Sequence, residues 1–233
     1  MYLKNVDNIQ NMSSFKEGLW TVQDESAMLV GKVIAPKAGE RILDLCSAPG
    51  GKSIHMAELM QDKGEIISCD IHPHKLELIV KNAERMGVSI IKPTLQDGTI
   101  CNEDFIQSFD RVLVDAPCSG LGIMKRKPDI RYNKEATDLE DIAAIQRAIL
   151  TQAVKYLKPE GILVYSTCTI SKAENEEMVA FITGELGLEL NKIVDTIPKV
   201  LQDEVEKESM IQILPQIAGT DGFFIAGLKK RGI

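Results

Sequence analysis

The sequence predicts an α/β fold in which helices cover both faces of a mostly parallel β-sheet. From Glu40 onward, strand-like apolar runs alternate with helix-like segments, and this alternation is typical of a parallel sheet. Two of the apolar runs, RVLVDAPCSG and GILVYSTCTI, lead into a cysteine, and a third, RILDLCSAPGGKS, leads into a glycine turn. The carboxyl ends of parallel strands share one rim where ligands bind, so we expect these three loops to meet there.

Five parallel strands are expected, with one helix ahead of them. That helix, Asp24–Ile34, leads into the first strand. Each strand candidate is a short apolar run of the length that strands adopt. In chain order the candidates are Arg41–Leu45, Gly64–Asp70, Ile90–Leu95, Arg111–Asp115 and Gly161–Thr167.

Two longer segments between these strands have helical periodicity. Lys75–Met86 places its apolar residues on one face, and Gly87 follows as a C-terminal stop. Asp138–Leu157 repeats apolar residues at helical spacing. The segment Lys158-Pro159-Glu160-Gly161 is expected to form a turn into the next strand.

The last third of the chain predicts one more helix and an antiparallel hairpin. Ser171 and Glu174 have the spacing of a capping box, which would start a helix running to about Gly184. Met210–Leu214 and Gly222–Leu228 are expected to form a hairpin that adds an antiparallel edge. The predicted sheet therefore has seven strands.

The first 20 residues differ from the rest, since they are polar and show no clear periodicity. We expect residues 1–20 to be the remnant of a preceding region and residues 21–233 to form one domain. No apolar run approaches the roughly 20 residues that cross a membrane. The N-terminus lacks the basic start and apolar core of a signal peptide, so a cytoplasmic protein is expected.

The five cysteines, at positions 46, 69, 101, 118 and 168, include no C-x-x-C pair. Neither a zinc site nor a disulfide scaffold is therefore expected. His72 and His74 flank Pro73 without nearby partners, so no metal is predicted. A free cysteine is usually a small buried residue, and this interpretation suits Cys69 and Cys101.

The glycine turn after the first strand indicates a nucleoside without a phosphate. It lacks the glycine spacing of the nucleotide-triphosphatase loop, because Cys46 occupies the required position, and it lacks G-x-G-x-x-G. Asp70 ends the next strand, where a carboxylate commonly binds ribose hydroxyls. Asp97 follows the third strand and is expected to meet the adenine end. S-adenosylmethionine has ribose but no phosphate and suits this pattern.

Cys118 and Cys168 are candidates for covalent catalysis. Both follow strand ends, Cys118 beside Asp115 and Cys168 after Thr167, so both thiols are expected at the same crevice. Cys168 also lies just before the capped helix expected near Ser171, whose N-terminus would favour a thiolate.

A basic run follows Cys118, although the net charge of −7 disfavours indiscriminate polyanion binding. Its side chains are candidates for contacts to nucleic-acid phosphates, which position a strand without reading its sequence. Trp20 and Tyr132 are candidates for base stacking, with ordinary packing as the favoured interpretation. The basic candidates are Lys125, Arg126, Lys127 and Arg131.

The segments DLCSAPGGKS, DAPCSGLG, KRKPDIR and STCTISKAEN, in this order, resemble the RNA cytosine-5 methyltransferases of the RsmB/Nop2/Sun family. The resemblance runs from about Gly18 to the C-terminus and includes DGFFIAGL. It implies a Rossmann-like class I S-adenosylmethionine-dependent methyltransferase fold. It also implies a cytosine in RNA as substrate, with small-subunit (16S) ribosomal RNA favoured. Members normally carry RNA-binding domains before the catalytic one, so that region is expected to be missing here.

The resemblance also implies roles for individual residues. Cys168 would be the nucleophile that bonds to C6 of cytosine, and Cys118 would help release the product. Asp115 would lie near the cofactor amine and the target base, and Lys52 near the same base. Asp70 would bind ribose and Asp97 adenine. The methionine-side cofactor loop would be Cys46, Ser47, Ala48, Pro49, Gly50, Gly51 and Lys52.

Two alternatives stay open at this point. One is a methyltransferase that acts on a non-RNA acceptor, a reaction that needs no thiol and would survive Cys168→Ala. The other is an S-adenosylmethionine-binding module of ribosome assembly, which would bind the cofactor without transferring a methyl group.

Overall fold

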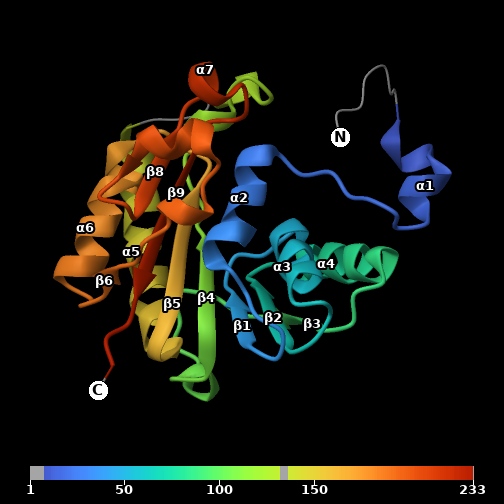
Figure 1. The fold of residues 1–233 in the computed structure, drawn as a ribbon, viewed down its shortest axis with the longest axis horizontal. Helices are drawn as coiled ribbons and strands as arrows, with labels where there is room; N and C mark the ends of the chain where they lie inside the picture. Colours follow the sequence, from blue (N-terminus) through green and yellow to red (C-terminus); the bar gives the residue numbers. More distant parts are fainter. Residues whose placement is uncertain (1–7, 132–135, 233) are drawn as a thin grey trace.

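The computed structural model describes residues 8–131 and 136–232, and its centre is one mixed sheet (Figure 1). The strand order is β3-β2-β1-β4-β5-β9-β8-β7, with β6 pairing β9. The five predicted parallel strands are present with small shifts at their ends. They are β1 (Arg41–Asp44), β2 (Glu65–Asp70), β3 (Ile91–Leu95), β4 (Phe109–Asp115) and β5 (Leu157–Thr167).

Helices cover both faces of the sheet, as predicted. On one face lie α2 (Glu25–Ile34), α3 (Gly51–Leu59) and α4 (Pro73–Met86), whose buried residues share a core cluster. On the other face lie α5 (Ala136–Tyr156) and α6 (Glu176–Gly184). In Figure 1, α5 and α6 stand on the opposite side of the strands from α3 and α4. Chain connections reverse between β1 and β4, which makes a topological switch point at the carboxyl ends of these strands.

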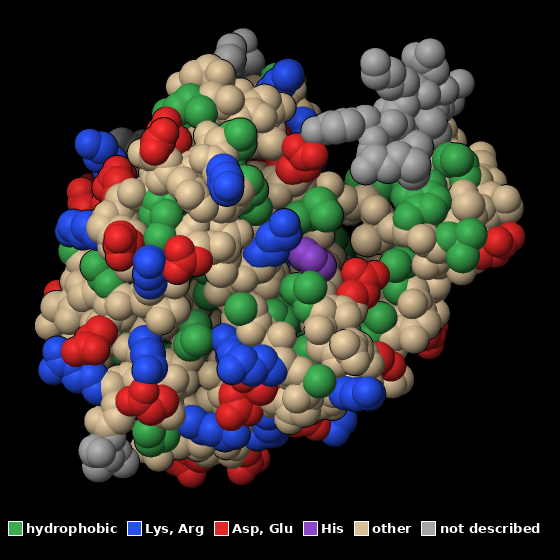
Figure 2. Space-filling model, viewed as in Figure 1, with side chains coloured by type: hydrophobic (Ala, Val, Ile, Leu, Met, Phe, Trp, Pro, Cys, Tyr) green, Lys and Arg blue, Asp and Glu red, His purple; other side chains and the backbone are tan. Residues whose placement is uncertain are grey.

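The surface in the same view carries Lys and Arg side chains interspersed with Asp and Glu (Figure 2). This mixture on the visible face accords with 27 basic and 34 acidic residues in the chain. Within residues 8–131 and 136–232, no helix combines the length and the apolar character that crossing a membrane requires.

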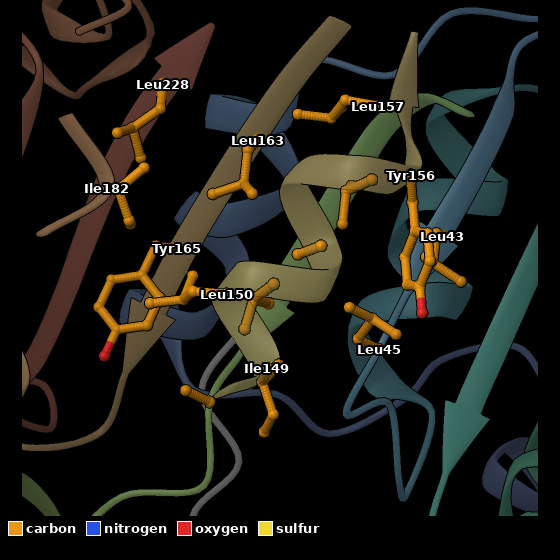
Figure 3. Close-up of a cluster of buried hydrophobic side chains, with 14 of the residues drawn as sticks. Leu43, Leu45, Ile149, Leu150, Tyr156, Leu157, Leu163, Tyr165, Ile182 and Leu228 are labelled. Atoms are coloured by element: carbon orange, nitrogen blue, oxygen red, sulfur yellow. The ribbon is translucent and has the colours of Figure 1, made fainter. Parts of the chain in front are cut away.

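The core under α5 and α6 shows why the apolar runs become buried strands. Alternate residues of a strand point to opposite faces. Leu163 and Tyr165 of β5 therefore pack with α5 and α6, whereas Val164 between them packs with α2 and α3. Figure 3 shows the α5 side, where Leu150 and Tyr156 lie against side chains of the sheet. Because both faces are buried, the strands are continuously apolar rather than alternating.

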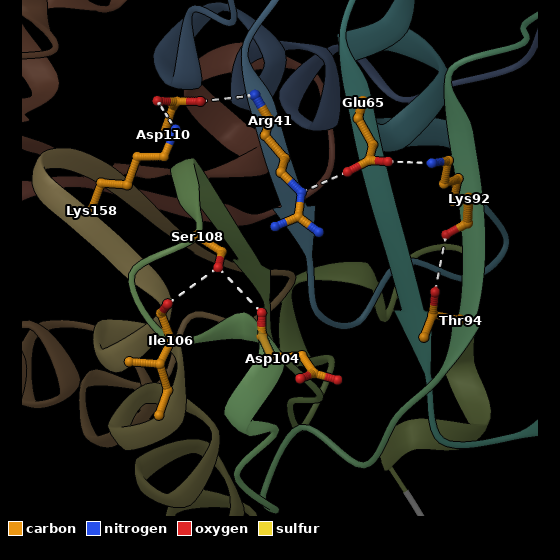
Figure 4. A network of polar contacts seen from close by, with 9 residues as sticks. All are labelled: Arg41, Glu65, Lys92, Thr94, Asp104, Ile106, Ser108, Asp110 and Lys158. Atoms are coloured by element: carbon orange, nitrogen blue, oxygen red, sulfur yellow. Dashed lines mark hydrogen bonds and ion pairs between the residues drawn. The ribbon is translucent and has the colours of Figure 1, made fainter.

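The amino ends of the strands are held by charged side chains (Figure 4). The Arg41 guanidinium lies 2.6 Å from Glu65, and Glu65 also pairs with Lys92. Asp110 accepts a hydrogen bond from the Arg41 amide at 2.9 Å and pairs with Lys158 at 2.7 Å. This network joins β1 to β4 at the edge opposite the predicted site.

The C-terminal hairpin is confirmed as an antiparallel addition to the parallel sheet. β8 (Met210–Ile213) pairs with β9 (Phe223–Lys229), and β9 pairs antiparallel with β5. Two further strands of two residues each, β6 (Glu189–Leu190) and β7 (Val205–Glu206), bring the described sheet to nine strands rather than seven. A helix, α7 (Pro215–Ala218), lies in the hairpin connection.

The segment predicted as a turn before β5 belongs to the strand. Phe109 of β4 pairs with Leu157, whereas Arg111 pairs with Ile162, so the register shifts across 158–161. Glu160 has a left-handed backbone with φ of 64°. The segment is therefore an irregular, bulged start of β5, which periodicity does not reveal.

The segment 8–20 is anchored on α4. It forms a 3₁₀ turn, Ile9–Asn11, and the short helix α1 (Ser13–Lys16). The Arg85 guanidinium stacks over Phe15 at 3.9 Å and donates to the carbonyl oxygens of Phe15 and Trp20, both at 3.0 Å. The Trp20 indole packs edge-on to Phe15 and donates to Ser14, so ordinary packing is the correct interpretation of Trp20.

Candidate functional site

Two adjoining cavities lie at the carboxyl ends of the parallel strands. Their volumes are about 530 Å³ and about 310 Å³. Cys46, Ala48 and Asp115 line both cavities, so the two form one continuous site at the switch point. We call the larger one the nucleoside cavity and the smaller one the thiol cavity.

The nucleoside cavity has acidic groups at one wall and apolar groups at another. Asp70 ends β2 and accepts a hydrogen bond from the His72 amide at 3.0 Å. Asp97 accepts hydrogen bonds from the Thr99 amide at 2.9 Å and from its hydroxyl at 2.7 Å. The apolar lining comes from Ile71 and from two α5 residues, Ile145 and Ile149. Carboxylates for ribose hydroxyls and apolar surface for a flat base suit a nucleoside.

The glycine turn connects β1 to α3 beneath both cavities. Ser47 donates to the carbonyl oxygen of Cys69 from its amide at 2.8 Å and from its hydroxyl at 2.9 Å. Gly50 has φ of 99°, a left-handed conformation that favours glycine, and its amide donates to Ser47. A Cβ at Gly50 would lie 3.3 Å from the Cα of Ile79, so the turn packs closely against α4.

Asp44 is a fully buried acid of this site that the sequence analysis missed. It is the last residue of β1 and lines the thiol cavity. One carboxyl oxygen accepts a hydrogen bond from Ser53 at 2.6 Å, and the other has no partner among the described residues. Burial raises the pKa of Asp44 to about 7. The available signal was a carboxylate ending an otherwise apolar strand.

Lys52 and Asp115 form an ion pair in the thiol cavity. The Lys52 ammonium lies 2.6 Å from one Asp115 oxygen, and the Ser166 hydroxyl donates to the other at 2.8 Å. Burial disfavours the charged amine, but attraction to Asp115 and the hydrogen bond between them outweigh it and raise the pKa of Lys52. Lys52 is therefore a cation held beside the Cys168 thiol.

Cys118 and Cys168 are paired thiols whose Sγ atoms lie 3.3 Å apart. The described lining of the thiol cavity includes Cys168 but not Cys118. The hydrogen bond from Cys118 lowers the pKa of Cys168, burial and Asp115 oppose this, and Lys52 supports it. The same hydrogen bond, together with burial, raises the pKa of Cys118. Cys118 thus keeps its proton, and Cys168 is the better thiolate.

Comparison with known proteins decides the family. Residues 31–229 match a family described as 16S rRNA methyltransferase RsmB/F. The chain belongs to this family. Its fold is that of S-adenosylmethionine-dependent methyltransferases, as the solved structures similar to it also show.

Three relatives illustrate the RsmB/F likeness. The probable ribosomal RNA small subunit methyltransferase B of Bacillus subtilis is 44% identical over 94% of this chain and 49% of its own length. The tRNA (cytosine(49)-C(5))-methyltransferase of Pyrococcus abyssi is 35% identical over 98% of this chain and 76% of its own. The crystal structure of NSun6 from Pyrococcus horikoshii with SFG has a TM-score of 0.84 at 33% identity, covering 97% and 56%. The chain spans about half the length of the first curated relatives it matches.

One prediction about the RsmB/F signature STCTISKAEN was wrong. Ser171 makes no side-chain capping bond, and the segment starts with a 3₁₀ turn, Lys172–Glu174, before α6 begins at Glu176. Glu174 instead accepts hydrogen bonds from Ser119 across the site. The low pKa of Cys168 therefore derives from Cys118 and Lys52, and not from a capped helix at Ser171.

The basic run lies at the rim of the thiol cavity. Lys125, Arg126 and Lys127 are exposed. Arg126 also pairs with Asp221, its Nε donating to the carboxylate at 3.1 Å, and both residues line the thiol cavity. Asp221 is a second acid of the site that the sequence analysis missed. Arg131 ends a 3₁₀ turn, but its side chain and Tyr132 lie outside the described part of the structure.

The two cysteines expected to be small buried residues differ in exposure. Cys69 is fully buried, as expected, whereas Cys101 is exposed, so the prediction of a buried residue was wrong there. The His72 and His74 rings stack with centroids 5.5 Å apart. Within the described ranges, no group of three or more metal-binding side chains is found.

Proposed function

We propose that the chain transfers a methyl group from S-adenosylmethionine to C5 of a cytosine in RNA, with small-subunit ribosomal RNA as substrate. A single observation carries the proposal. The thiol with the lowered pKa, Cys168, lines a cavity beside Lys52 and Asp115, directly next to a cavity suited to a nucleoside.

The site suits S-adenosylmethionine in both shape and charge. Asp70 would bind the ribose hydroxyls. Asp97 and the apolar wall of the same cavity would contact adenine, the wall being Ile71, Ile145 and Ile149. The cofactor carries positive charge on its sulfonium and ammonium groups, and Asp115 offers a carboxylate where the two cavities meet. When bound, it supplies an electrophilic methyl group.

C5 of cytosine is a poor nucleophile, and the addition of Cys168 to the ring activates it. The Cys168 thiolate bonds to C6, and the electron pair of the C5–C6 double bond becomes available at C5. After methylation, a base removes the C5 proton, the double bond re-forms, and the sulfur–C6 bond breaks to return the thiolate. Cys118, whose Sγ lies 3.3 Å from that of Cys168, assists this elimination directly or through water.

Lys52 and Asp115 stabilise the charges of these steps. Asp115 is a hydrogen-bond acceptor for the cytosine amino group, and Lys52 is a fixed cation beside the reacting thiol. Such preorganised charges act strongly where water is excluded. A cytosine within a duplex is out of reach of the thiol, so the target base is single-stranded or flipped out.

RNA trapping tests the proposal. Cys118→Ala and Cys168→Ala are each incubated with S-adenosylmethionine and unmodified small-subunit ribosomal RNA or tRNA, then run on a denaturing gel. We expect a covalent protein–RNA band for Cys118→Ala with ribosomal RNA and none for Cys168→Ala. The reverse pattern would exchange the roles of the two thiols, and a band with tRNA alone would change the substrate.

Methyl transfer to RNA by Cys168→Ala would overturn the covalent mechanism. Transfer to a non-RNA acceptor that Cys168→Ala retains would favour that alternative. Cofactor binding by the wild-type chain with no methyl transfer to either RNA would favour the non-catalytic assembly module.

A further inference from the structure

Two consecutive residues behind the thiols, Glu174 and Asn175, are fully buried polar side chains. Glu174 ends the 3₁₀ turn after β5, and Asn175 is the single residue between that turn and the start of α6. Burying polar groups is costly unless they are hydrogen-bonded. The partners of these two side chains come from the segments that carry Cys118 and Cys168.

Glu174 holds the segment around Cys118 on both sides. Its carboxylate accepts hydrogen bonds from the Ser119 amide at 2.8 Å and the Ser119 hydroxyl at 2.5 Å. It also accepts one from the Gln146 amide group at 3.2 Å, and that group donates to the Pro117 carbonyl at 2.9 Å. The residues immediately before and after Cys118 are thus fixed through one carboxylate.

Asn175 holds the segment around Cys168 in the same way. Its side-chain oxygen accepts a hydrogen bond from the Thr167 hydroxyl at 2.6 Å. Its amide group donates to the Thr169 carbonyl at 3.2 Å and to Gln212 of β8 at 2.8 Å. The residues immediately before and after Cys168 are therefore fixed through one amide.

The hydrogen-bond networks of Glu174 and Asn175 are connected to each other. The hydroxyl groups of Ser119 and Thr169 lie 2.7 Å apart in a hydrogen bond, and both residues are buried. Buried hydrogen-bond networks rigidify a site, and here only the side-chain oxygen of Gln146 lacks a partner among the described residues of the network. Misplacing a reacting group by about 1 Å can cost on the order of 100-fold in rate.

We propose that Glu174 and Asn175 are positioning residues for the two thiols, Glu174 for the thiol that completes the reaction and Asn175 for the thiol that attacks. The inference rests on the proposed function. It predicts opposite consequences for the covalent protein–RNA adduct: loss of Glu174 slows adduct resolution, whereas loss of Asn175 slows adduct formation.

The variants for Glu174 are Glu174→Ala and Glu174→Gln. Glutamine keeps an oxygen for the Ser119 and Gln146 donors, and its amide donates to the Ser119 hydroxyl, which rotates to donate to Thr169. In single turnover on RNA with S-adenosylmethionine, we expect Glu174→Ala to form adduct within about twofold of the wild-type rate and resolve it about tenfold more slowly. Glu174→Gln should restore resolution to within about threefold of wild type.

The variant for Asn175 is Asn175→Ala, which we expect to form adduct about tenfold more slowly and not to accumulate it. The matched control is Glu177→Ala, which replaces an exposed glutamate in α6, just after Asn175. It should leave adduct formation and adduct resolution unchanged. If Glu174→Ala fails to fold, Gln146→Leu releases the Pro117 carbonyl while keeping the Ser119 bonds. It should also slow resolution.

A merely structural role would slow both steps in parallel with a lower unfolding temperature, for Glu174→Ala and Asn175→Ala alike. That result would overturn the inference, as would slow adduct formation in Glu174→Ala. Cys118→Ala on the same gel separates the two proposals. If Cys118→Ala forms no adduct, the proposed function fails. If Cys118→Ala forms adduct and Glu174→Ala resolves its adduct rapidly, only the inference about Glu174 fails.

Discussion

At the scale of single residues, one hydrogen bond shifts the pKa values of two chemically identical side chains, Cys118 and Cys168, in opposite directions. Their Sγ atoms lie 3.3 Å apart, so one thiol can donate a hydrogen bond to the other. Cys168 has the Lys52 cation beside it and lines the cavity, and its lowered pKa makes it the thiol that loses its proton more readily. The pair titrates as a unit, which makes the behaviour of each thiol depend on the other.

We expect Cys118→Ala to raise the pKa of the Cys168 thiol, because the variant removes the donor that stabilises the thiolate. The measurement is the rate of Cys168 alkylation by iodoacetamide against pH, followed by peptide mass spectrometry. Cys168 in the wild-type protein should react at lower pH than an ordinary thiol, and the variant should need a higher pH. An unchanged pH profile would show that Cys118 does not set the Cys168 charge.

We expect Asp44→Asn to change stability in a pH-dependent way. Folded Asp44 keeps its proton up to a pH of about 7, its raised pKa, whereas the unfolded chain releases it near its usual pKa of 3.8. Between these values the folded protein binds more protons, so its stability falls as pH rises. Asparagine does not ionise. The free energy of unfolding of Asp44→Asn, relative to that of the wild-type protein, should therefore increase from pH 4 to pH 8. Urea unfolding across this range tests it, and a constant difference would contradict the raised pKa.

At the scale of elements, the sequence predicted the strands well because burial on both faces makes them continuously apolar. Their ends were less predictable, since the bulge at 158–161 depends on pairing with Phe109. Strands β6 and β7 are two residues long and carry no periodicity. The S-x-x-E pattern at Ser171 failed for a tertiary reason: Ser119, far away in sequence, offers Glu174 better donors than the local backbone.

The candidate site was predictable where its residues end an apolar strand, as Asp70 and Asp115 do, or directly follow one, as Cys168 does. It was not predictable where a role depends on partners from other elements. Asp44 ends a strand too, but its importance comes from complete burial. Arg126 belongs to a basic run in the sequence, yet its guanidinium pairs with Asp221 just before β9.

We expect Gly122→Ala to disrupt the site through backbone contact. The Gly122 amide donates to the Cys168 carbonyl at 3.0 Å, and the Gly122 carbonyl accepts from the Gly222 amide at 2.9 Å. A Cβ at Gly122 would lie 2.1 Å from the Gly222 carbonyl oxygen, so the backbone at Gly122 or at Gly222 must move. We expect the free energy of unfolding to fall by about 1–3 kcal/mol. We also expect the variant to lose adduct formation.

Gly184→Ala is the matched control for that substitution, because a Cβ there meets nothing within 4 Å. Its unfolding free energy should change by less than about 1 kcal/mol. Equal effects of the two variants on thermal unfolding and on adduct formation would show that the close contact at Gly122 is unimportant.

At the scale of the whole molecule, the charge distribution limits how the proposed RNA substrate would be bound. The net charge is −7, and the face in Figure 2 mixes both signs. The exposed basic residues at the rim, Lys125, Arg126 and Lys127, stay predictions for phosphate contacts. A protein with few such contacts binds RNA with a shallow dependence on salt.

We expect the logarithm of the RNA-binding constant to fall with the logarithm of salt concentration with a slope of about −2, which is three contacts at about 0.7 each for a single strand. Replacing Lys125 and Lys127 by alanine should leave a slope of about −0.7. Fluorescence anisotropy with a single-stranded RNA, repeated across salt concentrations, measures both. A slope that the double variant does not change would place the phosphate contacts elsewhere.

The position of β9 has a consequence for the order in which the protein matures during synthesis. This strand, Phe223–Lys229, is inserted between β5 and β8, and its first residues lie beside the thiol cavity. A ribosome that has released the chain through Cys168 has released every cysteine, but not the strand that borders Cys168. Because Phe223 of β9 lines the thiol cavity, the nascent chain completes this pocket only after β9 has emerged.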